Sequence, residues 1–338
     1  MSSSGDHPQL DAIATETHFS GVVRIDREEL IGLERAYGEA HRGYGIPNTT
    51  DTRFAIASGT KSFTALVVVS LIEDRRLELG TSARSILGND LPLVDGDVTI
   101  EHLLSHRSGI GDYLDEESDL DLDDYLMPLP VHELAETEQY LPVLDGYPMK
   151  FAPGARFGYS NSGYVVLALI AERTTGRKLP ELVAERVCER AGMVDTAFLR
   201  SDEPDGRTAL GYPAPTGLRT NVLHLPVRGA GDGGLHTTVA DISAFWRALF
   251  AGRIVSRRWV EEMTTPRHEG SGEESYGLGF WLDPANGVVT LKGCDTGISF
   301  RSTHRPATGQ TTTVVSNTTE GAWPVARMLA MIAEPDGA

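Results

Sequence analysis

The stretch FAIASGTKSFTALVVVSLIEDRRL, residues 54–77, decides the fold. After Lys61 it is mostly apolar through Ile72 and contains neither Pro nor Gly, which predicts a buried helix because strands are seldom this long. We expect the helix to begin beside Ser58 and to end near Gly80. At its N-terminus, unpaired peptide N–H groups and the positive end of the helix dipole favour a developing negative charge.

Ser58 and Lys61 form an S-x-x-K motif. Residues three apart share one face of a helix, so the lysine amine can reach the serine hydroxyl. A serine is a weak nucleophile until a base takes its proton, and a lysine can be that base when burial lowers its pKa. The pair is therefore a candidate nucleophile and base. Chance occurrence of two polar residues is the alternative, and the motif alone does not decide.

Length and charge limit the kinds of protein this chain can be. At 338 residues and 36.6 kDa it exceeds a single core, which stops growing at roughly 250–300 residues, so we expect two lobes. A net charge of -18 argues against nucleic acid or an anionic membrane as a partner. Two cysteines, Cys188 and Cys294, cannot build a disulfide framework. We expect both to be packed, although the position of Cys294 also makes it a candidate reactive thiol.

The first residues lack the basic segment and the apolar run of a signal peptide. No apolar run elsewhere reaches the roughly 18 residues that a membrane span requires. We therefore expect a cytoplasmic protein. An exported precursor whose leader has been removed is the alternative.

Strand patterns occur at both ends of the chain and helical patterns between them. The predicted strands are 19–25, 30–37, 276–282, 288–291, 297–304 and 310–316, and the further helices are 99–105, 165–173, 179–191, one from 239, and 323–333. We expect an α+β fold in which one antiparallel sheet joins both ends of the chain. Residues 8–80 and 230–338 would form that lobe, and 81–229 a mainly helical inserted lobe that includes a long connection over 195–229. Ligand sites favour such lobe interfaces.

Other polar residues could suggest a different site. The acidic run DEESDLDLDD, residues 115–124, lacks calcium-loop spacing, so we expect a solvated loop rather than a cation site. His106 and His236 do not belong to a nucleophile elbow, because the chain contains no G-x-S-x-G. Neither histidine has metal-ligand spacing with another His or Cys. We expect both to orient loops, and we expect neither metal nor other cofactor.

Three short motifs follow one another along the chain: Ser58-Gly59-Thr60-Lys61, Tyr159-Ser160-Asn161 and Asp295-Thr296-Gly297. In this order the chain resembles the serine β-lactamase-like and penicillin-binding-protein-like hydrolases, above all class C β-lactamases, related esterases and D-aminopeptidases. Seven stretches carry the resemblance: 19–23, 52–65, 99–110, 151–176, 191–198, 231–245 and 276–280. The resemblance implies a lobe with an antiparallel sheet, an all-helical lobe, and an active site between them.

The resemblance also implies a role for each motif residue. Ser58 would attack an ester, amide or lactam carbonyl and become acylated, and Lys61 would accept its proton. Tyr159 would relay protons as a phenolate stabilised by cations. Asn161 would bind the substrate and Lys61, and the peptide N–H groups of Ser58 and Ile298 would form the oxyanion hole. A buried aromatic residue and a turn amide are the structural alternatives for the second motif.

The third motif departs from the family pattern. It usually begins with Lys, or with His in esterase-like members, and here it begins with Asp295. A carboxylate would repel the substrate carboxylate that a cation attracts, so we expect substrates that are neutral or cationic, bordered by Asp295, Thr296 and Gly297. Alternatively, Asp295 pairs with Lys61 or with an arginine. Lys292 or Arg301 could restore the cation only through a bulge or bend.

These features predict a serine acyl-enzyme hydrolase or acyltransferase acting on ester or amide bonds of small molecules. A β-lactamase or a D-aminopeptidase- or DD-peptidase-like enzyme is the alternative within the family. A non-catalytic binding protein that kept the fold is the alternative outside enzymes. A cytoplasmic location would favour small-molecule chemistry over cell-wall peptides.

Overall fold

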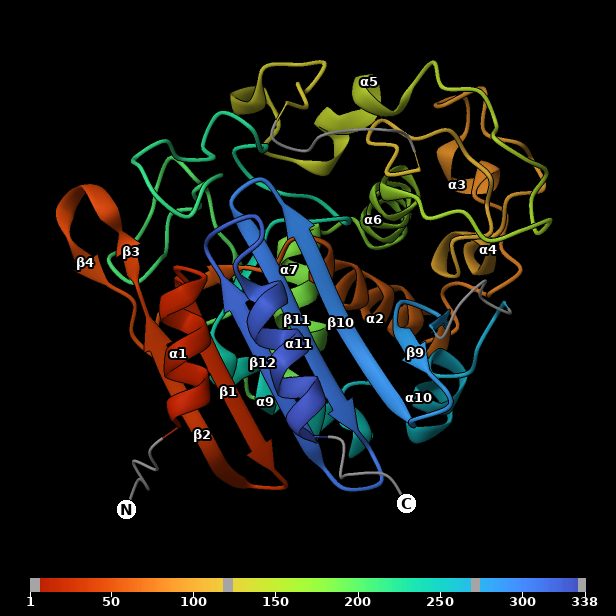
Figure 1. Ribbon diagram of the computed structural model, residues 1–338. Helices are drawn as coiled ribbons and strands as arrows, with labels where there is room; N and C mark the ends of the chain where they lie inside the picture. The colour runs from red at the N-terminus through yellow and green to blue at the C-terminus, as the bar shows by residue number, and fades with distance from the viewer. Residues whose placement is uncertain (1–6, 118–123, 269–273, 334–338) are drawn as a thin grey trace.

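A seven-stranded antiparallel sheet forms the centre of the molecule (Figure 1). The computed structural model describes residues 7–117, 124–268 and 274–333. The strand order is β2-β1-β12-β11-β10-β9-β8. The strands are β1 Gly21–Arg27, β2 Leu30–Tyr37, β8 Ser275–Tyr276, β9 Trp281–Asp283, β10 Val288–Asp295, β11 Ile298–Arg305 and β12 Gln310–Ser316.

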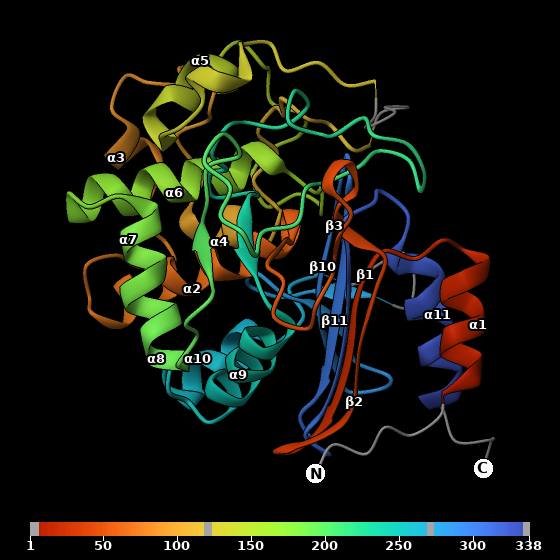
Figure 2. The ribbon, with the colours of Figure 1, turned by 90° about the vertical axis from the view of Figure 1, so that its left-hand side faces the viewer.

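The two ends of the chain meet in this sheet, as the strand pattern predicted. β1 pairs with β12, with Val22 opposite Val315 and Val23 opposite Val314. Because successive side chains of a strand point to opposite faces, Val22 and Val23 enter different cores. On one face lie α1 Pro8–Glu16 and α11 Ala322–Ala333, and on the other lie α2 Thr60–Glu73 and α9 Val239–Phe250 (Figure 2). The predicted α+β sheet architecture is confirmed.

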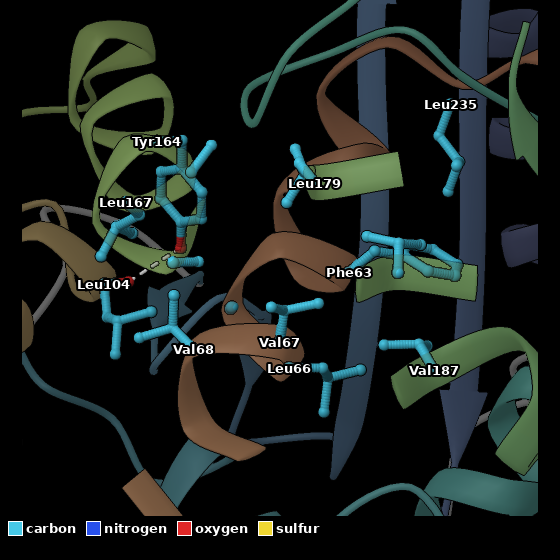
Figure 3. Packing of buried hydrophobic residues seen from close by; sticks show 14 of the residues in the cluster. Phe63, Leu66, Val67, Val68, Leu104, Tyr164, Leu167, Leu179, Val187 and Leu235 are labelled. Carbon is cyan, nitrogen blue, oxygen red and sulfur yellow. Dashed lines mark hydrogen bonds between the residues drawn. The ribbon is translucent and has the colours of Figure 1, made fainter. Parts of the chain in front are cut away.

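The helix α2 is surrounded by protein, and every residue from Thr60 to Ile72 is buried. A helix that is apolar on all sides belongs inside a fold. Phe63 and Val67 of α2 lie among residues of helical segments that follow it in the chain, including Leu179 and Val187 (Figure 3). The predicted end near Gly80 is wrong: α2 stops at Glu73 because Arg75 takes a left-handed φ of 60°.

Three other boundaries differ from the sequence predictions. The helix α6, Asn161–Thr175, begins four residues before the predicted 165 because the Ser160 side chain caps its first turn. The predicted strand 276–282 is split between β8 and β9, which pair with each other across a turn. The helix α1 was missed, and it packs Leu10 and Ala14 against α11.

The remaining elements are short. The helices are α3 Arg84–Leu87, α4 Ile100–Leu104, α5 Leu141–Leu144, α7 Leu179–Val183, α8 Glu189–Ala191 and α10 Arg257–Met263, joined by the helical turns η1 Arg42–Tyr44, η2 Ala57–Gly59, η3 Val131–Glu133, η4 Thr137–Tyr140 and η5 Ala184–Cys188. β3 Glu39–His41 pairs with β4 Ile46–Pro47, and β5 Phe54–Ala55, β7 Leu235–Thr237 and β6 Ala197–Phe198 form a small sheet.

Helices α3 to α6 gather at one end of the sheet (Figure 1). Within 195–229, the described chain contains only the two-residue strand β6, in agreement with the predicted connection. One hydrophobic core nevertheless contains Leu66, Leu167 and Phe245, which lie on both sides of the predicted lobe boundaries. The division at 80/81 and 229/230 therefore stays a prediction. In the described part of the chain, no helix is long and apolar enough to cross a membrane.

Burial of α2 gives a stability prediction. Leu66 is fully buried in the core, and truncating a buried leucine leaves a cavity, so Leu66→Ala should lower the free energy of unfolding by about 2–5 kcal/mol. Val194 is 87% exposed, so Val194→Ala should change it by less than about 0.5 kcal/mol. Urea unfolding of both variants measures the difference. Equal losses would show that α2 is not the packed centre of the core.

Candidate active site

Ser58 lies in the helical turn η2, directly before α2. The preceding Ala57 has a left-handed φ of 44°, which is uncommon for a residue with a side chain. β10 passes so close that a Cβ on Gly293 would stand 2.2 Å from the Ile56 carbonyl oxygen and 2.7 Å from the Ser58 peptide nitrogen. A glycine at 293 therefore lets the sheet support the turn that presents Ser58.

The Lys61 side chain is 2% exposed, and its Nζ has three polar contacts. They are Ser58 Oγ at 2.9 Å, Asn161 Oδ1 at 2.7 Å and the Asp232 carbonyl oxygen at 2.9 Å. The last two groups can only accept hydrogen bonds, whereas the serine hydroxyl can also donate. A neutral amine has two N–H groups and one lone pair, so this set of partners fits a neutral Lys61 that receives the Ser58 hydroxyl proton.

The electrostatic surroundings of Lys61 act in two directions. Burial lowers the pKa of Lys61, while Asp232, Glu116, Asp295 and Asp112 raise it, and the net direction is down. A lysine needs this direction of shift to act as a base near neutral pH.

Asn161 is held by contacts on both sides of its amide. Its Nδ2 donates to the Leu114 carbonyl oxygen at 2.9 Å and to Glu116 Oε1 at 3.0 Å, so Oδ1 must face Lys61. Its peptide N–H donates to Asp112 Oδ2 at 2.7 Å. Asp112 also binds Ser162, which fixes the first turn of α6. Sequence reasoning assigned no site role to Asp112, Glu116 or Asp232, although Glu116 lies in the acidic run and Asp232 in the stretch 231–245.

Tyr159 completes the cluster at Ser58. Its hydroxyl and that of Ser58 form a hydrogen bond, and Lys61 Nζ lies 5.0 Å from the centre of its ring. Burial raises the pKa of Tyr159 well above its usual value, and Glu116 and Tyr276 raise it further. These surroundings favour the protonated phenol and count against the expected phenolate, and the role of Tyr159 stays a prediction.

The third motif occupies a hairpin turn rather than a strand. Asp295 ends β10, Ile298 begins β11, and the two residues are directly opposite each other. Gly297, with φ 74°, makes the turn possible, and its N–H donates to Thr319 Oγ1 at 2.9 Å. The carbonyl oxygen of Thr296 accepts from Asn221 Nδ2 at 2.9 Å.

The turn sets the position of Ile298, the predicted second donor of the oxyanion hole. Ile298 is already on the returning strand, opposite Asp295. The role of Ile298 as second oxyanion donor stays a prediction. The peptide nitrogen of Ser58 keeps the predicted position at the start of α2.

Asp295 lines the same cavity as Ser58. Burial raises the pKa of Asp295 to about 7, Glu116 and Asp232 add to the rise, and Lys61 opposes it. Within the described residues, Asp295 forms no ion pair with Lys61 or with an arginine. Lys292 instead pairs with Glu274 at 2.6 Å, so it does not restore a cation. Arg301, on the strand after the turn, lies opposite Lys292, which is three residues before Asp295.

Polar and apolar side chains both line the cavity. Asp232 and Glu116 line it together with Ser58 and Asp295, and the Tyr113 hydroxyl donates to Asp232 Oδ2. Its aromatic and aliphatic lining includes Tyr125, Met127, Tyr140, Leu225 and Val227. Asn161, Thr296, Gly297 and Ile298 also line it. The shape suits a small substrate with an apolar part.

His236, Cys294 and Cys188 have structural surroundings. Burial lowers the pKa of His236 to about 4, and its Nδ1 lies 3.1 Å from the Gly234 carbonyl oxygen. Burial raises the pKa of both thiols to about 12, which disfavours the reactive thiolate. The expectation of packed cysteines agrees with these environments.

The acidic run lies partly outside the described residues, which resume at 124. Asp115 pairs with Lys150 at 2.8 Å, and Glu117 pairs with Arg156 at 3.4 Å. Glu116 lines the cavity, so the expectation of a purely solvated loop is wrong for this residue. In the described ranges, no group of three His, Cys, Asp or Glu side chains could hold a metal ion.

This arrangement of sheet, helices and cavity is the β-lactamase/transpeptidase-like fold. The chain belongs to the Beta-lactamase family, whose model matches residues 16–334. A solved penicillin-binding protein from Bacillus halodurans is 34% identical, with a TM-score of 0.89 over 96% of this chain and 99% of that chain.

Two curated relatives have different names. The putative penicillin-binding protein PbpX of Bacillus subtilis (strain 168) is 26% identical over 80% of this chain and 64% of its own length. Esterase EstB of Burkholderia gladioli is 34% identical over 63% of this chain and 56% of its own length. The chain thus spans between half and two thirds of the length of such relatives.

The raised pKa of Asp295 gives a pH prediction. The folded protein binds this proton more tightly than the unfolded chain, so stability falls as pH rises from about 4 to about 7. The Asp295→Asn variant has no carboxyl group to titrate at this position. The difference in melting temperature between the variant and wild type, measured by thermal denaturation, should therefore shift in favour of the variant between pH 5 and pH 8. Parallel pH curves for the two proteins would contradict the assigned environment of Asp295.

Proposed function

We propose that this protein is a serine hydrolase that cleaves ester or amide bonds of small molecules through an acyl-Ser58 intermediate. One observation carries the proposal: the buried Lys61 amine contacts two obligate acceptors and the Ser58 hydroxyl. A nucleophile and its base must lie within hydrogen-bonding reach of each other, as Ser58 and Lys61 do.

The proposed reaction begins when Ser58 Oγ attacks the substrate carbonyl carbon while Lys61 Nζ takes the hydroxyl proton. The peptide N–H of Ser58 donates to the oxyanion. Tyr159 gives its proton to the leaving group as the carbonyl–leaving-group bond breaks, and Lys61 then returns a proton to Tyr159. In the second half, water attacks acyl-Ser58 and the same groups move its protons in reverse. Another alcohol or amine in place of water would make the reaction an acyl transfer.

Asn161 and Asp112 would fix the base rather than react. Asn161 Oδ1 aims one N–H of Lys61 away from Ser58, which leaves the lone pair for the hydroxyl. Asp112 secures the peptide N–H of Asn161. Placing the base before the substrate arrives lowers the entropic cost of reaction.

Charge in the cavity supports a preference for neutral or cationic substrates. Asp295, Asp232 and Glu116 line the space beside Ser58, and a substrate carboxylate there would meet like charges. This charge favours esterase or amidase chemistry over β-lactamase or DD-peptidase chemistry, since the latter substrates carry a carboxylate.

Labelling of the nucleophile tests the proposed reaction. Wild type should react covalently with a fluorophosphonate probe and hydrolyse p-nitrophenyl esters, Ser58→Ala should do neither, and Lys61→Met should lose about 10²- to 10⁴-fold in rate. Ser70→Ala is the matched control, since Ser70 lies on the same helix and its Oγ donates to the Val67 carbonyl oxygen. A wild type that never labels would instead favour a binding protein.

Substrate charge is tested by comparing nitrocefin, which carries a carboxylate, with a neutral p-nitrophenyl ester. Wild type should turn over nitrocefin poorly, and Asp295→Asn should raise the nitrocefin-to-ester ratio of kcat/KM about tenfold because it removes one repulsive charge. The gain should grow from pH 6 to pH 8 as Asp295 ionises. Asp202→Asn, a surface change, is the control. Efficient nitrocefin turnover by wild type would refute the charge argument.

A further inference from the structure

We propose that His106 is a positioning residue that holds the Tyr159 phenol in register with Ser58. The inference rests on the proposed function, in which Tyr159 protonates the leaving group. The contacts of His106 are with Tyr159 and the residues on either side of it, so it would act through Tyr159.

The residues directly before and after Tyr159 both donate hydrogen bonds to His106. The peptide N–H of Gly158 donates to the His106 carbonyl oxygen at 2.8 Å. The peptide N–H of Ser160 donates to His106 Nδ1 at 3.1 Å. The residues before and after Tyr159 are thus tied to a single residue, which limits rotation of the backbone that carries the phenol.

The imidazole also packs against the phenol ring itself. The centres of the His106 and Tyr159 rings are 4.3 Å apart, with a 34° angle between the planes. Tyr164 at 5.0 Å and Tyr276 at 4.6 Å contact the same imidazole. The Tyr159 ring therefore leans on a support that is itself packed.

The backbone of His106 takes an uncommon conformation that brings these contacts together. Its φ is 54°, a left-handed value that a residue with a side chain seldom adopts. With this turn after α4, both the carbonyl oxygen and the ring nitrogen of His106 reach the 158–160 segment. The strained conformation thus accompanies the two-sided attachment of Tyr159.

The two ring nitrogens of His106 differ in their hydrogen bonding, and the difference favours a histidine at this position. Nδ1 accepts a hydrogen bond, so the proton of the neutral ring is on Nε2, which is buried without a hydrogen-bond partner in the described structure. An unpaired buried N–H is unfavourable, and a phenylalanine would fill the aromatic surroundings without it. Hydrogen bonding at Nδ1, in contrast, satisfies the Ser160 N–H beside Tyr159. We infer that the hydrogen bond accepted by Nδ1 offsets the free-energy cost of the unpaired Nε2 N–H.

The test compares leaving groups. A p-nitrophenolate departs without a proton, whereas an alkoxide needs one. For His106→Phe, kcat/KM should fall about 10- to 100-fold for alkyl esters, because a misplacement of about 1 Å has an effect of this size, and much less for p-nitrophenyl esters. In a series of phenyl, trifluoroethyl and ethyl esters of one acid, the dependence on leaving-group pKa should be steeper than in wild type. An unchanged dependence would overturn the proposal.

Two further comparisons separate positioning from folding. His304 of β11 is also buried, its Nδ1 lies 2.8 Å from Thr311 Oγ1, and its ring stacks on Trp246. His304→Phe therefore removes a similar contact from the sheet, whereas His106 lies outside the sheet. His304→Phe should leave the leaving-group dependence unchanged, and a matching change there would overturn the proposal. His106→Asn places an acceptor near Nδ1 and His106→Gln does not, so the asparagine variant should be the more active on alkyl esters. Equal activity would refute the role of the acceptor.

Labelling distinguishes this inference from the proposed function. If His106→Phe still reacts with fluorophosphonate at Ser58 while its leaving-group dependence is unchanged, only the role of His106 fails. If wild type does not label, the Ser58 reaction itself fails.

Discussion

Burial of the Lys61 amine is the constraint on which the site depends. The chain holds this amine inside the protein, 2% exposed, with Ser58, Asn161 and a carbonyl oxygen as its partners. A fully charged ammonium would be costly to bury, and burial lowers the pKa of Lys61 even though four carboxylates oppose it. The interior position thus converts a common surface cation into a candidate base. Everything that keeps water away from α2 contributes to that conversion.

The sheet supplies the rigid support for the nucleophile. β10 lies against the turn that holds Ser58, and the close approach requires a glycine at 293. β1 and β12 join the two ends of the chain in the same sheet, with β11 between β12 and β10. Asn161 begins α6, and Tyr159 lies just before the cap of that helix. The site therefore exists only when both parts of the fold are packed together.

Electrostatics distinguish this cavity from a site made for anionic substrates. Asp295 stands where the family usually has a cation, and Asp232 and Glu116 line the same space. Burial raises the pKa of Asp295, and the neighbouring carboxylates Glu116 and Asp232 raise it further. Burial also raises the pKa of Tyr159, with smaller contributions from the same two carboxylates. Burial and the carboxylates thus act in the same direction on both groups.

The sequence by itself determined the buried helix α2, the Ser58–Lys61 pair, the joining of terminal strands and the order of the three motifs. These follow from periodicity and from spacings within one element, which fix which side chains share a face. Only the tertiary structure decided the upward direction of the Tyr159 pKa shift, the hairpin at Asp295, the contribution of Asp112, Glu116 and Asp232, and the contacts of His106 with Tyr159. Protonation and cavity charge depend on burial and on neighbours distant in sequence, and no local spacing encodes them.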